Sequence, residues 1–411
     1  MSANKKREYI NEALKTPISG EYDVVVCGGG VAGIASALAS ARAGAKTVLL
    51  EKSYVLGGLA TAGLVTIYLP LCDGNGRQVS FSIAEELLKL SISHGAEFSK
   101  LQASDIDAWL TDSVNDEIMT RRQRSRYQVQ FNHNVFTILC EELLLKDGVK
   151  ILYGTSICQA VTDEDKIEYV ICENKNGRFA LSGKAFIDST GDADLCVFSG
   201  EKTDVYQRGN VLASWYYEHT GDELALKMLG YCEDPNAPID VQNSADNRYI
   251  GLDSQEISIF LEKGRRNILS SFLEGGEITK EHSLATIPTL PQFRMTRKLV
   301  ADYEIDESDD GKEFADSVGL FSNWKQRGPV YEMPLASLRG VKNKNLFVSG
   351  RCISVSQRTW DVTRVIPVCA VSGEASGVAA ALVASDGKVD VKKLQSILLK
   401  NGVKLHKNSI N

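Results

Sequence analysis

Three glycines that follow an apolar run near the N-terminus, Gly28, Gly30 and Gly33, have the spacing of a phosphate-binding turn. The run begins at Asp23 and reads Asp-Val-Val-Val-Cys before the first glycine. Gly28 permits a tight turn, Gly30 lets the backbone approach a pyrophosphate, and Gly33 lets a helix pack closely on a strand. The pattern is weak alone, because a glycine-rich turn in another α/β fold would look the same.

Glu51 supplies the context that the glycines need. It lies 23 positions after Gly28, where its carboxylate can accept hydrogen bonds from both hydroxyls of an adenosine ribose. The same acid disfavours a 2′-phosphate, so NADP is not expected here. Val31 and Ala32 begin the helix whose N-terminus attracts phosphate, and Lys52 stands beside the acid. These residues predict a binding site for an adenosine diphosphate group.

A second glycine-rich segment points from nicotinamide toward flavin. Gly57, Gly58 and Thr61 belong to a flexible, donor-rich stretch just beyond the second predicted strand. An extended FAD pyrophosphate and ribityl chain would run past it. The alternative is an ordinary mobile loop.

The elements that must position these residues form a βαβ unit. We expect a buried strand at 22–27, a helix at 32–43 ended by Gly44, and a second strand at 47–50. Downstream, the pattern predicts helices at 81–93, 136–146, 254–274, 294–303 and 367–384, an irregular polar region up to about 126, and strands at 150–153, 157–162, 167–173, 179–181, 185–189 and 345–349.

Composition bounds the partners. The 411 residues suggest two domains, or one large α/β domain with an inserted lobe. The net charge of −7 argues against nucleic acid or an anionic membrane as the main partner. Nine scattered cysteines without a Cys-x-x-Cys spacing favour neither a disulfide framework nor a zinc site, and a reducing cytoplasm fits best. A small-molecule substrate is expected, and homo-oligomerisation stays open.

One apolar stretch imitates a membrane span. Residues 24–41 carry no charge and have the required length, but glycines interrupt them. The preceding residues 8–23 are too polar for a signal peptide. A strand, a turn and a helix explain the stretch better, and we expect no other segment of this kind.

Several segments together resemble the bacterial FAD-dependent oxidoreductase family within the glutathione-reductase-like flavoproteins, to which the succinate dehydrogenase and fumarate reductase flavoproteins are similar. The resemblance covers most of the chain. It is carried by residues 21–30, by Leu56-Gly-Gly-Leu-Ala-Thr61, by Ala185-Phe-Ile-Asp-Ser-Thr-Gly-Asp-Ala-Asp194, by Arg294-Met-Thr-Arg297, and by Asn345-Leu-Phe-Val-Ser-Gly-Arg-Cys-Ile-Ser354.

The resemblance implies an α/β fold in which a Rossmann-like, glutathione-reductase-like FAD-binding domain carries an inserted α+β substrate domain. It implies a discontinuous FAD domain at 20–70, 130–200 and 335–390, a substrate or cap domain at 71–129 and 201–334, and a C-terminal tail at 391–411. Its further cofactor-binding residues here are Gly191, Asp192, Gly350, Arg351 and Pro367, the last of which begins a helix that points its N-terminus at the flavin. Arg351 stands where the wider superfamily places an acid, so that acid's contact does not carry over.

Arginines are the candidates for substrate recognition. Arg294 and Arg297, three apart on the expected helix, would share one face, and Arg364 would oppose them. A guanidinium there can bind a substrate carboxylate or phosphate, or neutralise a flavin anion. The alternative is salt bridging to the 53 acids of the chain. The family also often has a histidine before Arg364, where this sequence has Gln357 and Arg358.

Three functions remain open on these grounds. The first is an FAD-dependent oxidoreductase that moves a hydride between a small organic substrate and flavin N5, with an unknown electron donor or acceptor; an anionic substrate is one version of this hypothesis. The second is an NAD-binding enzyme like thiazole synthase, although such chains are shorter and lack the large second lobe. The third is a non-catalytic FAD-binding protein.

Overall fold

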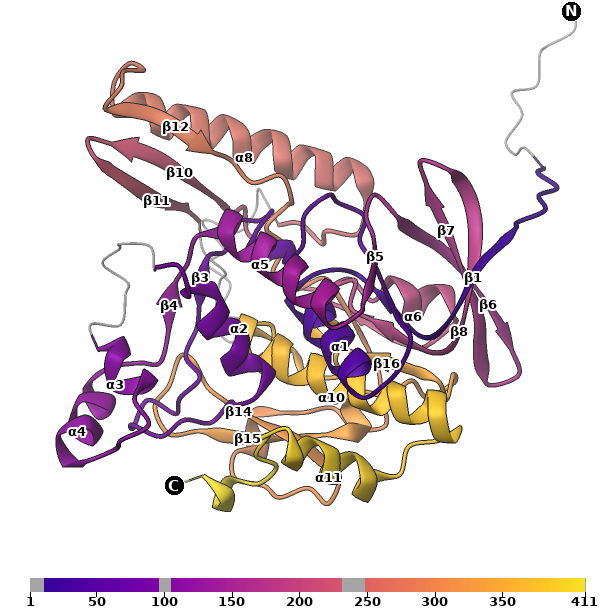
Figure 1. Ribbon diagram of the computed structural model, residues 1–411. Helices are drawn as coiled ribbons and strands as arrows, with labels where there is room; N and C mark the ends of the chain where they lie inside the picture. Colours follow the sequence, from indigo (N-terminus) through magenta and orange to yellow (C-terminus); the bar gives the residue numbers. More distant parts are fainter. Residues whose placement is uncertain (1–10, 96–104, 231–247, 411) are drawn as a thin grey trace, which may run out of the picture.

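A mostly parallel sheet forms the centre of the molecule. The computed structural model describes residues 11–95, 105–230 and 248–410. Strands β5 (Lys150–Leu152), β2 (Thr47–Leu50), β1 (Ile18–Cys27) and β8 (Gly177–Asp188) lie parallel in that order, and β16 (Leu346–Val348) pairs in parallel with β8 (Figure 1). Val24–Cys27 are fully buried, as expected for a strand covered on both faces.

β8 has different neighbours along its length. Its first half pairs antiparallel with β7 (Lys166–Asn174), which continues to β6 (Ser156–Asp163). Its last residues, Phe186–Asp188, pair instead with β16. Because β1, β8 and β16 run in the same direction, their carboxyl ends meet at one edge, where ligands bind in sheets of this kind.

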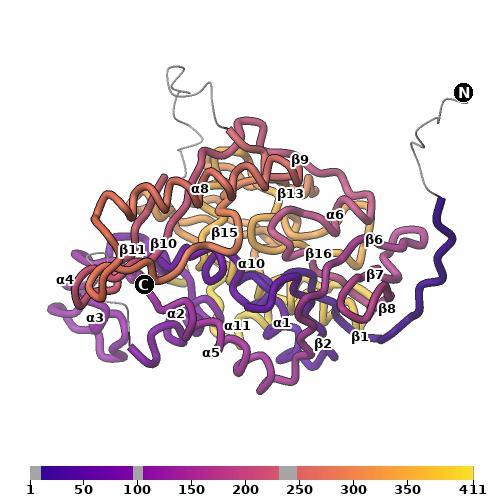
Figure 2. Tube along the Cα trace, turned by 90° about the horizontal axis from the view of Figure 1, so that it is seen from above, coloured from indigo at the N-terminus to yellow at the C-terminus, as the bar shows by residue number. Residues whose placement is uncertain are grey.

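Two parallel helices cover one face of this sheet. α1 (Val31–Arg42) and α10 (Ile366–Asp386) pack against each other and lie side by side near the centre of the view in Figure 2. Gly373 faces Ala32 and Gly377 faces Ser36, where an added Cβ would come within 2.4 Å of a backbone oxygen in each case. The absence of side chains at these two positions therefore allows the close approach of the helices.

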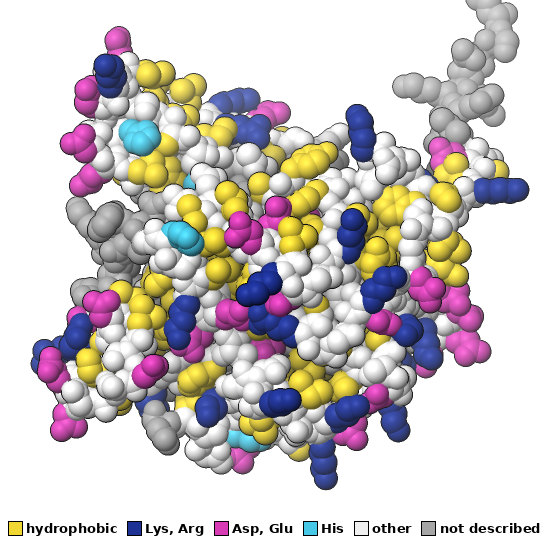
Figure 3. All heavy atoms as spheres, viewed as in Figure 1, with side chains coloured by type: hydrophobic (Ala, Val, Ile, Leu, Met, Phe, Trp, Pro, Cys, Tyr) yellow, Lys and Arg dark blue, Asp and Glu magenta, His cyan; other side chains and the backbone are white. Residues whose placement is uncertain are grey.

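By length and composition, α10 could cross a membrane, yet 94% of its most apolar window is buried inside the fold. We expected only residues 24–41 to have this character, and α10 corrects that. Its apolar residues are those of a core helix. On the face in Figure 3, acidic and basic side chains are interspersed.

A separate lobe, here called the cap lobe, projects beyond the sheet (Figure 1). It consists of the antiparallel strands β11 (Glu223–Leu229), β10 (Ser214–Thr220) and β12 (His282–Thr286) with helix α8 (Ser254–Glu274) packed on β10. Asp253 caps α8 by accepting from the N–H groups of Gln255 and Glu256. Phe260, Gly264, Ile268 and Phe272 recur every fourth residue, so they form the buried face of the helix.

The remaining elements surround these two parts. They are β3 (Ile67–Tyr68), α2 (Ile83–Ser91), α3 (Ile106–Leu110), α4 (Asp116–Arg124), β4 (Val129–Gln130), α5 (His133–Lys146), α6 (Asp194–Phe198), β9 (Thr203–Val205), β13 (Arg297–Leu299), β14 (Ser317–Ser322), β15 (Val330–Pro334), α9 (Gln357–Thr363) and α11 (Val391–Lys400), with short 3-10 turns at Gly58–Ala60, Glu307–Asp309, Leu335–Ser337, Gly350–Cys352 and Lys407–Ser409.

The structure corrects three secondary-structure predictions. The strands expected at 179–181 and 185–189 are one continuous strand, β8. The region expected to be irregular up to residue 126 contains α3 and α4. The helix expected at 294–303 does not form, because Arg297–Leu299 pairs as strand β13 with β9. The backbone of residues 294–296, just before β13, is hydrogen-bonded to the side chain of Asn210 and to the N–H of Tyr206 and not within a helix.

Candidate functional site

The glycine turn joins β1 to α1 as its spacing predicts. Gly28 has a φ of 104°, and a Cβ there would lie 2.4 Å from the carbonyl oxygen of Ser189. A Cβ on Gly33 would lie 1.8 Å from the carbonyl oxygen of Gly28, so helix and strand meet without a side chain between them. A Cβ on Gly30 would meet nothing within 4 Å. The turn is therefore closed at Gly28 and Gly33 and open at Gly30.

Glu51 lies at the end of β2 and holds the turn. Its Oε2 accepts from the N–H of Gly29 at 2.7 Å, and its Oε1 accepts from the N–H of Ser53 at 2.7 Å. The side chain is buried beside the glycine turn. Each carboxylate oxygen can accept a second hydrogen bond, as binding of a ribose would need. Lys52, next in the chain, is exposed.

The second glycine-rich segment lies directly on the first. The N–H of Gly57 donates to the carbonyl of Gly29 at 2.8 Å. A Cβ on Gly58 would approach the Cα of Gly30 to 3.1 Å, so both glycines are needed for this contact. The hydroxyl of Thr61 donates to the carbonyl of Leu56 and closes the segment on itself. The open position at Gly30 is therefore bordered by Gly57 and Gly58.

The N-terminus of α10 lies on the same side as that of α1 and extends beyond it. Since Gly373 lies beside Ala32 in a parallel pair, Ile366 is about 10 Å farther out along the common axis, at 1.5 Å per residue. Pro367 stands in the first turn, and no side chain of the described residues caps this end or the start of α1. Two helix N-termini thus present partial positive charge on the same side.

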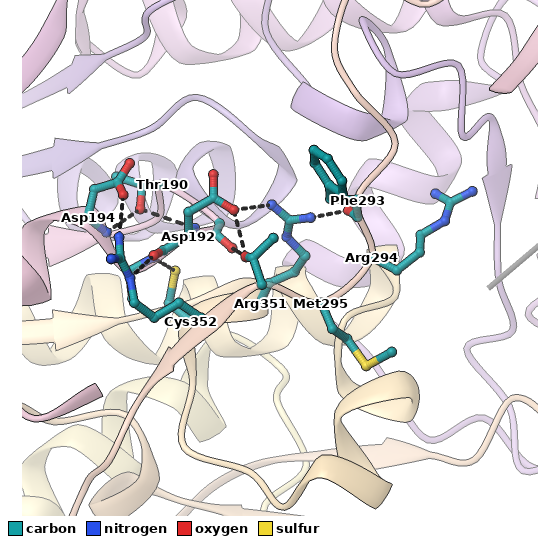
Figure 4. A network of polar contacts seen from close by, with 12 residues as sticks. Thr190, Asp192, Asp194, Phe293, Arg294, Met295, Arg351 and Cys352 are labelled. Atoms are coloured by element: carbon teal, nitrogen blue, oxygen red, sulfur yellow. Dashed lines mark hydrogen bonds and ion pairs between the residues drawn. The ribbon is translucent and has the colours of Figure 1, made fainter. Parts of the chain in front are cut away.

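An acidic turn after β8 is held by arginines from two other segments (Figure 4). Arg351 donates to Oδ1 of Asp192 at 3.1 Å and to the carbonyl of Phe293. Arg297 donates to the carbonyl of Asp192 at 2.8 Å and to Oδ1 of Asp194 at 2.7 Å. Burial, together with the carboxylates of Asp192 and Asp188, raises the pKa of Asp194 to about 6, although Arg297 opposes this.

The three arginines predicted to be catalytic do not share one face. Arg297 begins strand β13, whereas Arg294 lies at a bend three residues earlier, so the two do not lie on a common helix face. Arg297 is bound to the acidic turn, and Arg364 pairs with buried Asp361, its Nε 2.8 Å from Oδ1. Arg294 instead lies over the ring of Trp215 in the cap lobe, 4.9 Å from its centroid, and points away from the Arg351 network in Figure 4.

A cluster of polar side chains lies where the cap lobe contacts the rest of the protein, and no sequence motif marks it. The hydroxyls of Tyr217 and Thr66 are 2.5 Å apart, and Gln130 donates to the Tyr217 hydroxyl at 3.2 Å. His133 stacks on Tyr217 with 5.6 Å between ring centroids, and burial lowers its pKa. The aromatic run 215–217 was the one visible signal in the sequence for this cluster.

Gln292 ties the cap lobe to the second glycine segment. Its Nε2 donates to the carbonyl of Gly63 at 2.6 Å, and its Oε1 accepts from the N–H of Trp215 at 3.1 Å. The N–H of Thr289 donates to the carbonyl of Ala62 at 2.9 Å. Gln292 and Thr289 therefore join the cap lobe directly to the second glycine-rich segment.

These residues fit FAD. The open position at Gly30 lies at an uncapped helix N-terminus, as a pyrophosphate requires, and Glu51 lies where the adenosine ribose would be bound. Residues 57–63 and the N-terminus of α10 would hold the remainder of the cofactor. Metal chemistry needs its own ligands, and the described residues contain no group of three or more His, Cys, Asp or Glu side chains able to hold a metal ion.

Comparison with known proteins gives relatives of two kinds. A thioredoxin reductase from Ureaplasma parvum is 32% identical over 72 residues, which are 18% of this chain and 23% of that protein. The chain therefore matches about a quarter of that relative's length, and it lacks any Cys-x-x-Cys pair.

Solved structures resemble the whole chain at low identity. A geranylgeranyl bacteriochlorophyll reductase-like protein from Thermoplasma acidophilum is 13% identical with a TM-score of 0.49, over 93% of this chain and 84% of that one. The p-nitrophenol 4-monooxygenase of Pseudomonas putida is 13% identical with a TM-score of 0.47, over 93% and 85%. Such distant likeness indicates neither substrate nor reaction.

The family comparison is decisive, because its two matched segments cover most of the chain and include the glycine turn, the acidic turn and α10. The family described as FAD dependent oxidoreductase matches residues 23–212 and 234–398. The predicted resemblance, the α/β fold and FAD as cofactor are thereby confirmed, and NAD in this site is not supported. The chain belongs to the FAD-dependent oxidoreductases and is an enzyme of that family.

Proposed function

We propose that this oxidoreductase transfers a hydride between a small organic anion and N5 of its flavin. One observation carries the proposal. The side chain of Gln292 binds the carbonyl of Gly63 in the second glycine segment. Thr66, three residues after Gly63, is hydrogen-bonded to the hydroxyl of Tyr217 in the cap lobe. A cofactor that starts at Gly30 and passes Gly58 would thus have its far end enclosed between the FAD domain and the cap lobe.

The protein's own groups divide the work in this arrangement. When bound, FAD supplies the centre that accepts or donates the hydride. The glycine turn and Glu51 hold its adenosine diphosphate half, and the N-terminus of α10 favours negative charge farther along. Trp215 and Tyr217 are buried, so they exclude water from the junction.

Arg294 is the group that we propose to recognise the substrate. It is buried against Trp215 and lies two residues after Gln292, at the junction of cap lobe and cofactor segment. A guanidinium in this position favours a carboxylate or phosphate on the substrate. Arg297 and Arg364 are engaged by acids of the protein, so we propose that they shape the site and do not touch the substrate.

The test is anaerobic reduction of the bound flavin by a panel of small carboxylates and matched neutral compounds. The Arg294→Met variant should retain FAD and be reduced by the best carboxylate at least tenfold more slowly, which is about 1.4 kcal/mol of transition-state stabilisation. Arg358→Met is the control, because Arg358 is exposed and pairs with Glu307. Normal turnover by Arg294→Met would end the proposal of an anionic substrate.

A nicotinamide should not be the direct reductant. Enzymes reduced through a dedicated NAD(P)H domain carry a second Gly-x-Gly-x-x-Gly turn, and this sequence has one. We expect NADH and NADPH to bleach the flavin slowly in stopped-flow measurements. Bleaching at ordinary enzyme rates would assign the electron donor and contradict this part of the proposal.

A further inference from the structure

Arg351 stands where three separate segments meet. It follows Gly350, whose φ of 68° suits glycine, at the exit of β16. Its guanidinium lies over Gly191, where an added Cβ would come within 2.6 Å of Nη2. It binds Asp192 of the acidic turn and the carbonyl of Phe293 near the cap lobe (Figure 4). Gly350 thus supplies the backbone conformation just before Arg351, and Gly191 leaves room for its guanidinium.

The location is next to the two positive helix ends. A Cβ on Gly350 would lie 2.8 Å from Cβ of Ala32 in the first turn of α1, and 3.6 Å from Sγ of Cys369 in the first turn of α10. Burial raises the pKa of the Cys369 thiol to about 12, and the charges of Arg351 and Arg364 oppose that rise. The residue before Arg351 thus lies between the first turns of α1 and α10.

The guanidinium retains hydrogen-bonding capacity. It carries five N–H donors, and within residues 11–95, 105–230 and 248–410 its two hydrogen bonds go to Phe293 and Asp192. Asp192 is fixed in turn, because its Oδ1 accepts from the hydroxyl of Thr296 at 2.7 Å. The side chain of Arg351 is 14% exposed, so its charge is only partly screened by solvent. It is a positioned cation with donors to spare.

We propose that Arg351, positioned by Asp192, sets the reduction potential of the bound flavin. Two electrons and one proton convert the neutral flavin ring to a monoanion, so a nearby cation stabilises the reduced form more than the oxidised form. The proposal deepens the proposed function but rests only on its FAD part, and it does not require an anionic substrate. A cation that touched only the pyrophosphate would stabilise both forms equally and leave the potential unchanged.

The experiment exploits the two partners of one ion pair. Arg351→Met and Asp192→Asn break the same contact but change the charge in opposite directions. In a dye-linked anaerobic titration of the holoprotein, Arg351→Met should lower the ratio of reduced to oxidised FAD affinity about tenfold, and Asp192→Asn should raise it. Tenfold corresponds to about 30 mV for a two-electron couple. Shifts of opposite sign support the proposal.

Two further variants serve as controls. Arg351→Lys keeps the positive charge but loses the planar guanidinium with its paired donors. The reduction potential of its flavin should therefore stay close to that of the wild type. Arg42→Met removes an ion-paired arginine at the far end of α1, bound to Glu86 and Asp147, and should leave the potential unchanged.

Several outcomes would overturn the proposal. The proposal fails if Arg351→Met and Asp192→Asn shift the reduction potential in the same direction, or by no more than Arg42→Met does. The ion pair would then only connect two segments of the fold. Loss of oxidised FAD by Arg351→Met with an apoprotein that melts normally would assign Arg351 to holding the cofactor in both states. If Arg351→Met fails to fold, an Asp192→Asn potential that does not rise overturns it alone. The titration uses no substrate, so failure of the Arg294 test leaves it intact, whereas a wild type without FAD would defeat the proposed function itself.

Discussion

The glycine turn and the cap lobe both contact the second glycine-rich segment, but they use different parts of the chain to do so. The turn does so with backbone: Gly28, Gly30 and Gly33 have no side chains, and what matters is how closely one main chain can approach another. The cap lobe does so with the side chains of Gln292 and Tyr217. The first surface therefore suits a cofactor that is the same in every member of a family, and the second can change with the substrate.

The sharpest test of this contrast is Gly30→Val. A side chain there enters open space in the apoprotein, so the fold should persist, but it would occupy the position expected for the pyrophosphate. FAD should bind at least a thousandfold more weakly, about 4 kcal/mol, in a titration followed by flavin fluorescence. The apoprotein should melt within about 2 °C of the wild type. Stoichiometric yellow protein from this variant would show that the site is elsewhere.

Gly33→Ala, three residues away, should do the reverse. Its Cβ would overlap the carbonyl oxygen of Gly28, so α1 must move off the sheet. Overpacking of this kind costs about 3 kcal/mol in the free energy of unfolding, measurable by urea denaturation of the apoprotein. An apoprotein of unchanged stability would mean that helix and strand are not in the close contact described here.

The interior of α10 predicts a pH dependence of the free energy of unfolding. Glu374 is buried and accepts from the hydroxyl of Ser82 at 2.7 Å and from the N–H of Ile83 at 3.2 Å. Burial raises its pKa from 4.5 to about 7. The folded state therefore keeps its proton between pH 4.5 and 7 while the unfolded state loses it, so this group's contribution to stability is full below 4.5 and declines as the pH rises to about 7.

The loss across that window is about 3 kcal/mol, and Glu374→Gln should abolish it. Urea denaturation of both proteins at pH 5 and pH 7.5 measures the difference. Parallel pH profiles for wild type and variant would show that Glu374 is ionised in the native state at both pH values.

The smallest effect is expected on the cap-lobe side. Gln292→Glu keeps the size of the side chain but replaces the donor to Gly63 with an oxygen. The free energy of unfolding should fall by about 1–3 kcal/mol, because a buried carbonyl is left unpaired. FAD affinity should change less than threefold. A loss of FAD comparable to that of Gly30→Val would erase the distinction between the two surfaces.

Sequence was informative where geometry is local. The positions of β1, α1, β2 and α10 follow from buried runs, glycines and the length of the apolar helix, and the structure confirms them. Gly28 and Gly33 were assigned correct backbone roles because a tight turn and a helix–strand contact involve neighbours in the chain.

The contacts of the arginines depended on partners far away in the chain. The charged segment 294–303 has helical spacing, but pairing with Thr203–Val205 makes part of it a strand. Residues 292–296, which overlap its start, are all buried, and burial of consecutive residues cannot be inferred from an amphipathic pattern. Likewise, nothing local to Tyr217 indicates that its hydroxyl meets Thr66, 151 positions earlier. The domain boundaries and the substrate residues stay predictions.

The parallel contact between α1 and α10 has a consequence for how the molecule is made. α1 ends at Arg42 and α10 begins at Ile366, so more than 300 residues must be synthesised before the first βα unit meets the helix that packs on it. At ordinary ribosomal speeds this interval lasts roughly 15–70 s. During it, the small apolar face of α1 waits without its partner. The nascent chain therefore acquires a complete nucleotide site only after α10 has been made, and cofactor capture follows the synthesis of more than 300 intervening residues.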